Sequence, residues 1–222
     1  QTFALRSNLI VDGLPDTVCF EKGAFALTVG GLSVAERGDL IIEMDSVDGD
    51  FVAAANPCRI TEDAVLLPYW GDLHGQSEET IGTNSARDFY EFARDKAFLD
   101  VCVHQGNDFQ ITNAFWAWLN ELSAEFTKDD HFIVFPGWEW SGNTGLGGDR
   151  NVLHMNEGRQ IHRSSHALVD DLSDLDTDAN SAADLFADLK GEDCTVFAHI
   201  GGRYADIKIA HDDRLERAVE VH

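Results

Sequence analysis

The sequence predicts an α/β fold built on a parallel sheet or barrel, with a small β region before it. From about residue 64, strand-like apolar runs alternate with segments of helical spacing, and this alternation is typical of parallel strands joined by crossover helices. Before that point, short apolar runs are separated by Gly, Asp and Asn, which is typical of a small β unit. We therefore expect a β region over residues 1–63 and an α/β domain over residues 64–222.

Each element of the α/β domain is predicted from its spacing of apolar residues. The strands are expected at 65–70, 99–104, 132–140, 194–200 and 217–222. The helices are expected at 84–98, 112–126 and 181–190, where Asn84 or Ser85, Thr112 and Ser181 provide N-caps. The tryptophans in the second helix and third strand are of a type and spacing more often found in a core than in a pocket wall.

Composition excludes several functions. The chain of 222 residues has 40 acidic and 16 basic residues and a net charge of -24, which argues against a nucleic-acid partner because like charges repel. No apolar run approaches the roughly 20 residues of a membrane span. The four cysteines form no C-x-x-C pair, so neither a disulfide framework nor a zinc knuckle is expected, and a reducing, cytoplasmic compartment is favoured. The acidity indicates a solvated surface, loops that gather cations, or both.

Metal-ligand side chains stand at or just after the end of every predicted strand. They are His74, then His104, Gln105, Asn107 and Asp108, then Glu139, His199 and His222. In α/β barrels the loops at the carboxyl ends of the strands converge on one face. Residues far apart in the chain are therefore expected to meet in one site.

The chemistry of this set points to divalent metal ions. Imidazole nitrogen together with carboxylate and amide oxygen suits Zn, Mn or Fe, and one to three ions are expected. Such a site lowers the pKa of a bound water and clamps a phosphoryl oxygen. The single-residue alternative is a hydrogen-bonded histidine at each strand end, but five coinciding strand ends favour a shared site.

Other polar residues are weaker candidates. His162 and His166 have i, i+4 spacing that suits contact with substrate or metal, although the serines between them equally suit a loop. Arg150 and Arg203 follow glycines in loops, where a guanidinium suits phosphate recognition or, equally, a salt bridge to nearby acids. The remaining histidines are less informative: His154 is a further candidate, and His131 and His211 are expected away from the site.

Several of these motifs together resemble a known family. GDLHGQS resembles D-L-H-x-H, the first signature of the PHP (polymerase and histidinol phosphatase) superfamily. The series YWGDLHGQSEETIG, HQGNDFQIT, PGWEWSG with GGDRNV, HRSSH, AHIGGRYAD and AVEVH is most similar to the PHP-like domain-of-unknown-function family 3604. The resemblance covers about residues 25–222. It implies a distorted, TIM-like β/α barrel of seven strands, up to three metal ions, and hydrolysis of phosphate esters.

The family's ligand positions map onto this sequence one at a time. His74 matches the first signature His, and Gln76 stands where the second His would be. Asn107, with Asp108 beside it, falls where the second strand would put a His. The remaining matches are Glu139, which would bridge metals, His199 and His222.

Two features depart from the family pattern. Gln76 and Asn107 are weaker donors than imidazole, so one or two ions are expected unless Asp108, Asp72 or His104 compensates. The family's closing Asp-x-His motif is absent from these 222 residues. The resemblance therefore implies an incomplete barrel, which a missing C-terminal segment would complete.

The sequence thus predicts a metal-dependent phosphoesterase acting on a small-molecule phosphate ester. A metal-bound hydroxide held by His74, Glu139 and His199 would attack phosphorus, and Arg203 or Arg150 would bind the non-bridging oxygens. An acid such as Asp72, or a metal-bound water, would transfer protons. Two alternatives stay open. The same metal site suits an amidohydrolase-like or other ester hydrolase, and the replacements at Gln76 and Asn107 suit a degenerate, ligand-binding PHP-like domain.

Overall fold

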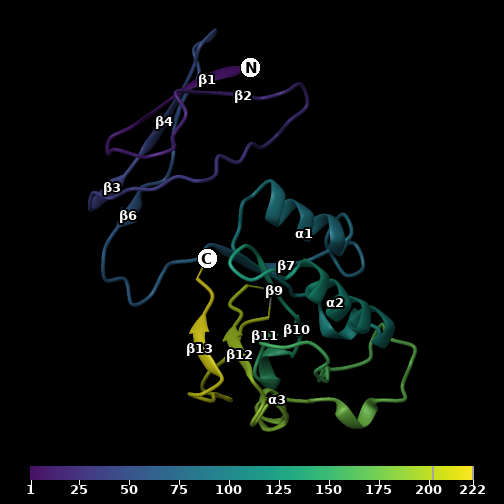
Figure 1. Cartoon of the computed structure of the whole chain (residues 1–222). Coiled ribbons are helices and arrows are strands. Elements are labelled where there is room, and N and C mark those ends of the chain that lie inside the picture. The colour runs from purple at the N-terminus through teal and green to yellow at the C-terminus, as the bar shows by residue number, and fades with distance from the viewer. Residues whose placement is uncertain (202, 222) are drawn as a thin grey trace. The chain divides into compact units, whose positions relative to one another are not determined.

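The computed structural model describes residues 1–201 and 203–221, and it divides into two compact units, Gln1–Pro68 and Tyr69–His222 (Figure 1). The first unit is built from antiparallel strands alone. One sheet has the order β2-β1-β4-β5, and β3 pairs with β6. Phe3 is buried in this unit, where its ring meets those of Phe20 and Phe51 edge-on. The strands are β1 (Thr2–Ser7), β2 (Thr17–Cys19), β3 (Gly38–Leu40), β4 (Ile42–Ser46), β5 (Val52–Ala54) and β6 (Cys58–Ile60).

The second unit holds two further sheets and all three α-helices of the described chain. A parallel sheet has the order β7-β8-β9, and a mixed sheet has the order β10-β11-β12-β13. The strands are β7 (Gly71–Gly75), β8 (Val101–His104), β9 (Ile133–Phe135), β10 (Gly137–Trp140), β11 (Arg150–His154), β12 (Cys194–Ala198) and β13 (Glu216–Val219). The helices are α1 (Ala86–Asp95), α2 (Asn113–Phe126) and α3 (Ala182–Asp188), with 3-10 turns at Asp108–Gln110, Thr144–Leu146 and Leu175–Thr177.

Each helix begins where its capping residue predicts. Ser85 accepts a hydrogen bond from the backbone N–H of Asp88, whose carboxylate in turn accepts from the Ser85 backbone, so α1 opens with a capping box. Thr112 and Ser181 cap α2 and α3 in the same way through their hydroxyls. A satisfied N–H at the first turn stabilises a helix by about 1 kcal/mol.

The prediction of a barrel is wrong: the described residues form four separate small sheets and no barrel. The main cause is β11, in a segment that the sequence analysis treated as a loop. It lies between β10 and β12 and pairs antiparallel with both, so the strands there do not run in one direction. Figure 1 shows β12 and β13 side by side at one edge of this sheet, and they are its only parallel pair among the described strands.

Among the strand boundaries that differ from the prediction, two involve proline. The apolar run at 65–70 contains Pro68 and has no strand geometry; the strand begins at Gly71 instead. The run at 132–140 is divided at Pro136 into β9 and β10, which pair with different strands. Proline lacks the N–H that a sheet ladder requires, so a proline disfavours a continuous strand in both runs.

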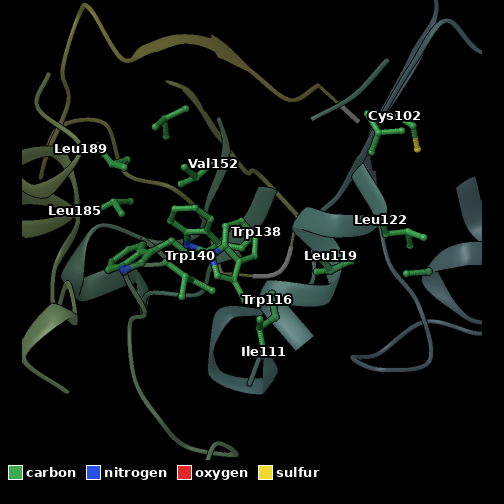
Figure 2. Packing of buried hydrophobic residues seen from close by; sticks show 14 of the residues in the cluster. Cys102, Ile111, Trp116, Leu119, Leu122, Trp138, Trp140, Val152, Leu185 and Leu189 are labelled. Carbon is green, nitrogen blue, oxygen red and sulfur yellow. The ribbon is translucent and has the colours of Figure 1, made fainter. Parts of the chain in front are cut away.

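Tryptophans form the centre of the core of the second unit (Figure 2). Trp138 and Trp140 on β10 are fully buried, and Trp138 meets Trp116 of α2 edge-on with ring centroids 5.4 Å apart. The indole of Trp140 donates to the carbonyl of Ala179. Because successive side chains of a strand point to opposite faces, anchoring both tryptophans in the core directs Glu139 between them to the other face.

No helix among the described residues combines the length and apolar character that crossing a membrane requires.

Gly148→Ala is expected to lower the free energy of unfolding by about 1 to 3 kcal/mol, the cost of a strained backbone position. Gly148 has a φ of +76°, and a Cβ there would lie 1.7 Å from the carbonyl oxygen of Tyr204. Gly145→Ala in the same loop is the matched control, because its Cβ would meet nothing within 4 Å, and it should change stability by less than about 0.5 kcal/mol. Urea unfolding of both variants measures the difference, and equal midpoints would contradict the close approach.

Candidate metal centre

Two histidines and one glutamate form a cluster in the second unit. One ligand atom from each of His74, Glu139 and His199 lies within 4.8 Å of the others. The Nε2 of His74 is 3.7 Å from one carboxylate oxygen of Glu139, and the Nδ1 of His199 is 3.1 Å from the other. Two imidazoles and a carboxylate are a donor set that suits Zn, Mn or Fe. The cluster therefore fits a divalent metal ion.

The strands and the segments just beyond them bring the three residues together. The backbone of Gln105, just after β8, donates to Gly75 at the end of β7, and the backbone of Glu139 donates to Gly106. A bridge between Asn107 and Glu139 joins the segment after β8 to β10. His199 follows β12 directly and donates its backbone N–H to Asp149. The predicted convergence of these residues therefore occurs, although it does so in a mixed arrangement of strands.

Glu220, directly after β13, adds a second carboxylate to the cluster. Its Oε1 is 2.5 Å from Nδ1 of His74, and its Oε2 is 3.6 Å from Nε2 of His199. The two glutamates and the two histidines therefore alternate around a closed ring, in which each carboxylate contacts both imidazoles. The imidazoles meet edge-on, with ring centroids 4.6 Å apart.

Two amide side chains, at positions where the PHP resemblance would place histidines, also reach the cluster. The side-chain amide of Asn107 donates to Oε2 of Glu139 at 2.9 Å and to the hydroxyl of Ser141 at 3.0 Å. Gln76 places its amide nitrogen 3.4 Å from the same Glu139 oxygen, and its carbonyl accepts from Thr80. In this arrangement the amides support Glu139 through N–H groups, which cannot bind a metal.

Mutual contact within the cluster shifts the pKa of two of its members in opposite directions. Burial opposes the charge on His74, but the carboxylate of Glu139 3.7 Å away and the hydrogen bond to Glu220 outweigh it and raise its pKa to about 9. Burial likewise opposes the charge on Glu139, yet the two histidines hold its pKa below the ordinary value. The ionised carboxylate and the protonated imidazole thus stabilise each other.

The cluster lies in an open cavity of about 910 Å³. Its wall includes one arginine, Arg203, whose side chain is paired with Asp149 at 3.1 Å and lies over the ring of Phe109. Burial and the negative charge of Glu139 raise the pKa of Asp149 to about 6, and Arg203 partly offsets this. The cavity is lined by His74, Gln76, Ile81, Asn107, Phe109, Glu139, Asp149, His199, Arg203, Glu220 and Val221.

Arg150 and Asp108, both predicted for the site, are not among the residues that line this cavity. Arg150 is fully buried, its Nε is 2.7 Å from Glu216, and its guanidinium donates to the carbonyls of Gly147, Gly148 and Ala210. Asp108 accepts from the backbone and hydroxyl of Ser164 and from the backbone of Phe109. Both side chains therefore hold loops together.

The predicted histidine pair is also placed outside the cavity lining. His166 is held between Asp174 and Asp178 at 2.9 and 3.0 Å, and its side chain is 3% exposed. His162 contacts the carbonyl of Thr177. The two histidines lie in an irregular segment, so the helical spacing between them has no structural counterpart.

The remaining candidates have structural roles. The carboxylate of Asp72 accepts the backbone N–H of His74, so it braces the ligand-bearing turn. His104 is buried against Ser77, and burial lowers its pKa to about 3. His154 is buried beside Trp138, and burial lowers its pKa to about 4. Neither His104 nor His154 lines the cavity. The predicted ligand His222 lies outside the described residues.

Sequence reasoning missed Glu220 and Asp149. The last strand was extended to residue 222, which gave weight to the histidine at its end, whereas β13 ends at Val219. Glu220 is then the first residue after the strand, the position that identified His199. Asp149 precedes Arg150 in GGDR, and the same glycine pair that indicated the arginine is the sequence signal for the adjacent carboxylate.

Comparison with known proteins adds little about activity. No family model matches the chain, and no solved structure matches it. An uncharacterized protein of Chlamydia pneumoniae is 25% identical to the chain over 159 residues, which are 71% of this chain and 23% of that protein. The matched region thus spans less than a quarter of that relative's length.

Alanine substitution of His74, Glu139 or His199 is expected to abolish binding of Mn²⁺ or Zn²⁺, because each removes one of three converging donors. Elemental analysis and metal titration of each purified variant, beside the wild type, measure the loss. His131→Ala is the matched control, since this exposed histidine lies away from the cluster, and it should bind metal as the wild type does. Full retention of metal by Glu139→Ala would rule out the cluster as the site.

Proposed function

We propose that this chain is a metal-dependent hydrolase that cleaves phosphate esters. The observation that carries the proposal is the convergence of His74, Glu139 and His199 at the wall of an open cavity. The similarity of GDLHGQS and the motifs after it to the PHP superfamily supports the same reaction class.

The donor atoms fit the chemistry that a phosphoesterase needs. Nε2 of His74, the carboxylate of Glu139 and Nδ1 of His199 would hold the metal ion. When bound, such an ion lowers the pKa of a coordinated water and polarises a phosphoryl oxygen. The amides of Gln76 and Asn107 hold the Glu139 carboxylate in place through their N–H groups.

Arg203 gives the cavity its affinity for an anion. It is the one arginine or lysine among the described residues that line the cavity, and it remains 39% exposed. A guanidinium binds two oxygens of a phosphate at once. Asp149 orients it by ion pairing, and with a pKa of about 6 the Asp149 carboxyl can take up or release a proton near neutral pH.

A second candidate function is ligand binding without catalysis. The observation that favours it is the orientation of Gln76 and Asn107, whose amide nitrogens face Glu139 where the resemblance would place imidazoles. Such a site holds fewer metal ligands than the family pattern. Metal binding without turnover on any substrate would identify this function.

The wild-type chain loaded with Mn²⁺ or Zn²⁺ is expected to hydrolyse at least one of a panel of phosphomono-, di- and triesters, and His74→Ala should remove the activity. Arg203→Ala should lower kcat/KM by about 100-fold, since it removes a charged contact to the developing anion. Arg159→Ala, which affects a half-exposed surface ion pair with Glu192, is the matched control and should leave kcat/KM unchanged. Hydrolysis of carboxylic esters or amides in place of phosphate esters would refute the substrate class.

Metal affinity is expected to rise with pH. In the metal-free protein His74 has a pKa of about 9, so at neutral pH a metal ion must displace its proton. Between about pH 6.5 and 9 the association constant should increase by about tenfold per pH unit and then level off. Calorimetric titrations in buffers of different ionisation enthalpy measure both the affinity and the proton released. A pH-independent affinity over this range would contradict the protonated state of His74.

A further inference from the structure

We propose that Glu220 is a positioning residue, which accepts the Nδ1–H of His74 and thereby fixes Nε2 as the nitrogen that faces Glu139. In its bearing on metal binding this inference rests on the proposed function. The hydrogen bond itself is a property of the metal-free protein. Neither the family resemblance nor the sequence pattern assigned a role to this residue.

The geometry distinguishes the two nitrogens of the His74 ring. Nδ1 is 2.5 Å from Oε1 of Glu220, whereas Nε2 is 3.7 Å from Oε2 of Glu139. The shorter contact is within hydrogen-bond distance, and the longer one leaves a separation that an ion can bridge. A hydrogen bond at one imidazole nitrogen sets the tautomer and makes the other nitrogen available as a ligand.

The environment of Glu220 favours this supporting role over direct metal binding. Its Oε1 accepts from the side-chain amide of Asn151 at 3.0 Å as well as contacting His74. Asn151 is fully buried on β11, directly opposite Glu139 of β10 in the sheet register. The same carboxylate oxygen is therefore directed at two N–H donors.

The backbone fixes Glu220 in the same position. Its N–H donates to the carbonyl of Ala198 at 3.0 Å, which continues the parallel pairing of β12 and β13. The next residue along β12 is His199, whose Nε2 is 3.6 Å from the other oxygen of Glu220. One carboxylate thus hydrogen-bonds the imidazole of His74 and lies beside that of His199, and its side chain is only 14% exposed.

Removal of a carboxylate that orients a metal-binding histidine typically costs about 10- to 100-fold in metal affinity. Glu220→Gln retains an oxygen that accepts a hydrogen bond but loses its charge, so its Co²⁺ affinity should fall by about tenfold. Glu220→Ala leaves the His74 ring free to turn, so its Co²⁺ affinity should fall by about 100-fold. Both variants should still bind the same number of Co²⁺ ions as the wild type, and the visible spectrum of the bound Co²⁺ should change.

The test pairs Co²⁺ titration with ¹⁵N-histidine NMR of the metal-free protein. In the wild type His74 should give a slowly exchanging Nδ1–H signal, assigned by its absence from His74→Ala, and Glu220→Ala should lose it. Glu121→Gln, on the exposed face of α2, is the matched control and should alter neither the affinity nor the signal. Thermal unfolding verifies that each variant is folded, and the conservative Glu220→Gln carries the test if Glu220→Ala does not fold.

The outcomes separate this inference from the proposed function. Unchanged Co²⁺ affinity and an unchanged Nδ1–H signal in Glu220→Gln and Glu220→Ala would overturn the positioning role while metal-dependent hydrolysis stands. Loss of one whole equivalent of Co²⁺ in Glu220→Gln would also overturn it, because Glu220 would then be a ligand. A wild type that binds no Co²⁺ but shows the Nδ1–H signal, lost in Glu220→Ala, would refute the metal site and retain the hydrogen bond.

Discussion

The side chain of Glu139 is only 4% exposed, so both of its carboxylate oxygens require partners within the protein. Side chains from several strands of the second unit supply these partners. A buried charge without partners is costly, whereas one that is paired and hydrogen-bonded is tolerated. His199 and His74 contact opposite oxygens of Glu139, and the amide of Asn107 donates to one of them. These three partners lie at or just after the ends of three different strands, β7, β8 and β12, so the ion cluster and the sheet geometry depend on each other.

Part of this architecture is predictable from sequence because it depends on local chemistry. Helix starts follow from the capping residues Ser85, Thr112 and Ser181, which act within one turn. Strand direction depends on long-range pairing. The short strand β11 has five consecutive buried residues with Arg, Asn and His among them, so neither alternation nor an apolar run indicates it. Its antiparallel position therefore could not be predicted, and the barrel expectation failed there.

The candidate site was more predictable than the fold, because the type of residue at the end of a strand can be read from the sequence even when the direction of the neighbouring strands is predicted wrongly. His74, Glu139 and His199 were identified by chemistry and position, and the structure brings them together. The arginines illustrate the limit of this reasoning. Arg150 and Arg203 both follow glycine in the sequence, yet one is fully buried against Glu216 and the other lines the cavity. Only packing distinguishes them: Arg150 begins β11 and Arg203 lies in the loop after β12, and contacts distant in sequence fix both positions.

Charge balance links the proton of His74 to the proposed metal ion. Three carboxylates line the cavity, from Glu139, Asp149 and Glu220, against one guanidinium. In the metal-free protein the raised pKa of His74 supplies a compensating positive charge. A divalent ion held by His74, Glu139 and His199 would supply more positive charge, so the imidazole of His74 could lose its proton while the carboxylates stayed compensated. The hydrogen bond from Nδ1 to Glu220 would be retained in this exchange, because it involves the other nitrogen. His74, Glu139, His199 and Glu220 therefore form an ion cluster in the metal-free protein, and the same side chains would be an oriented donor set for the proposed metal ion.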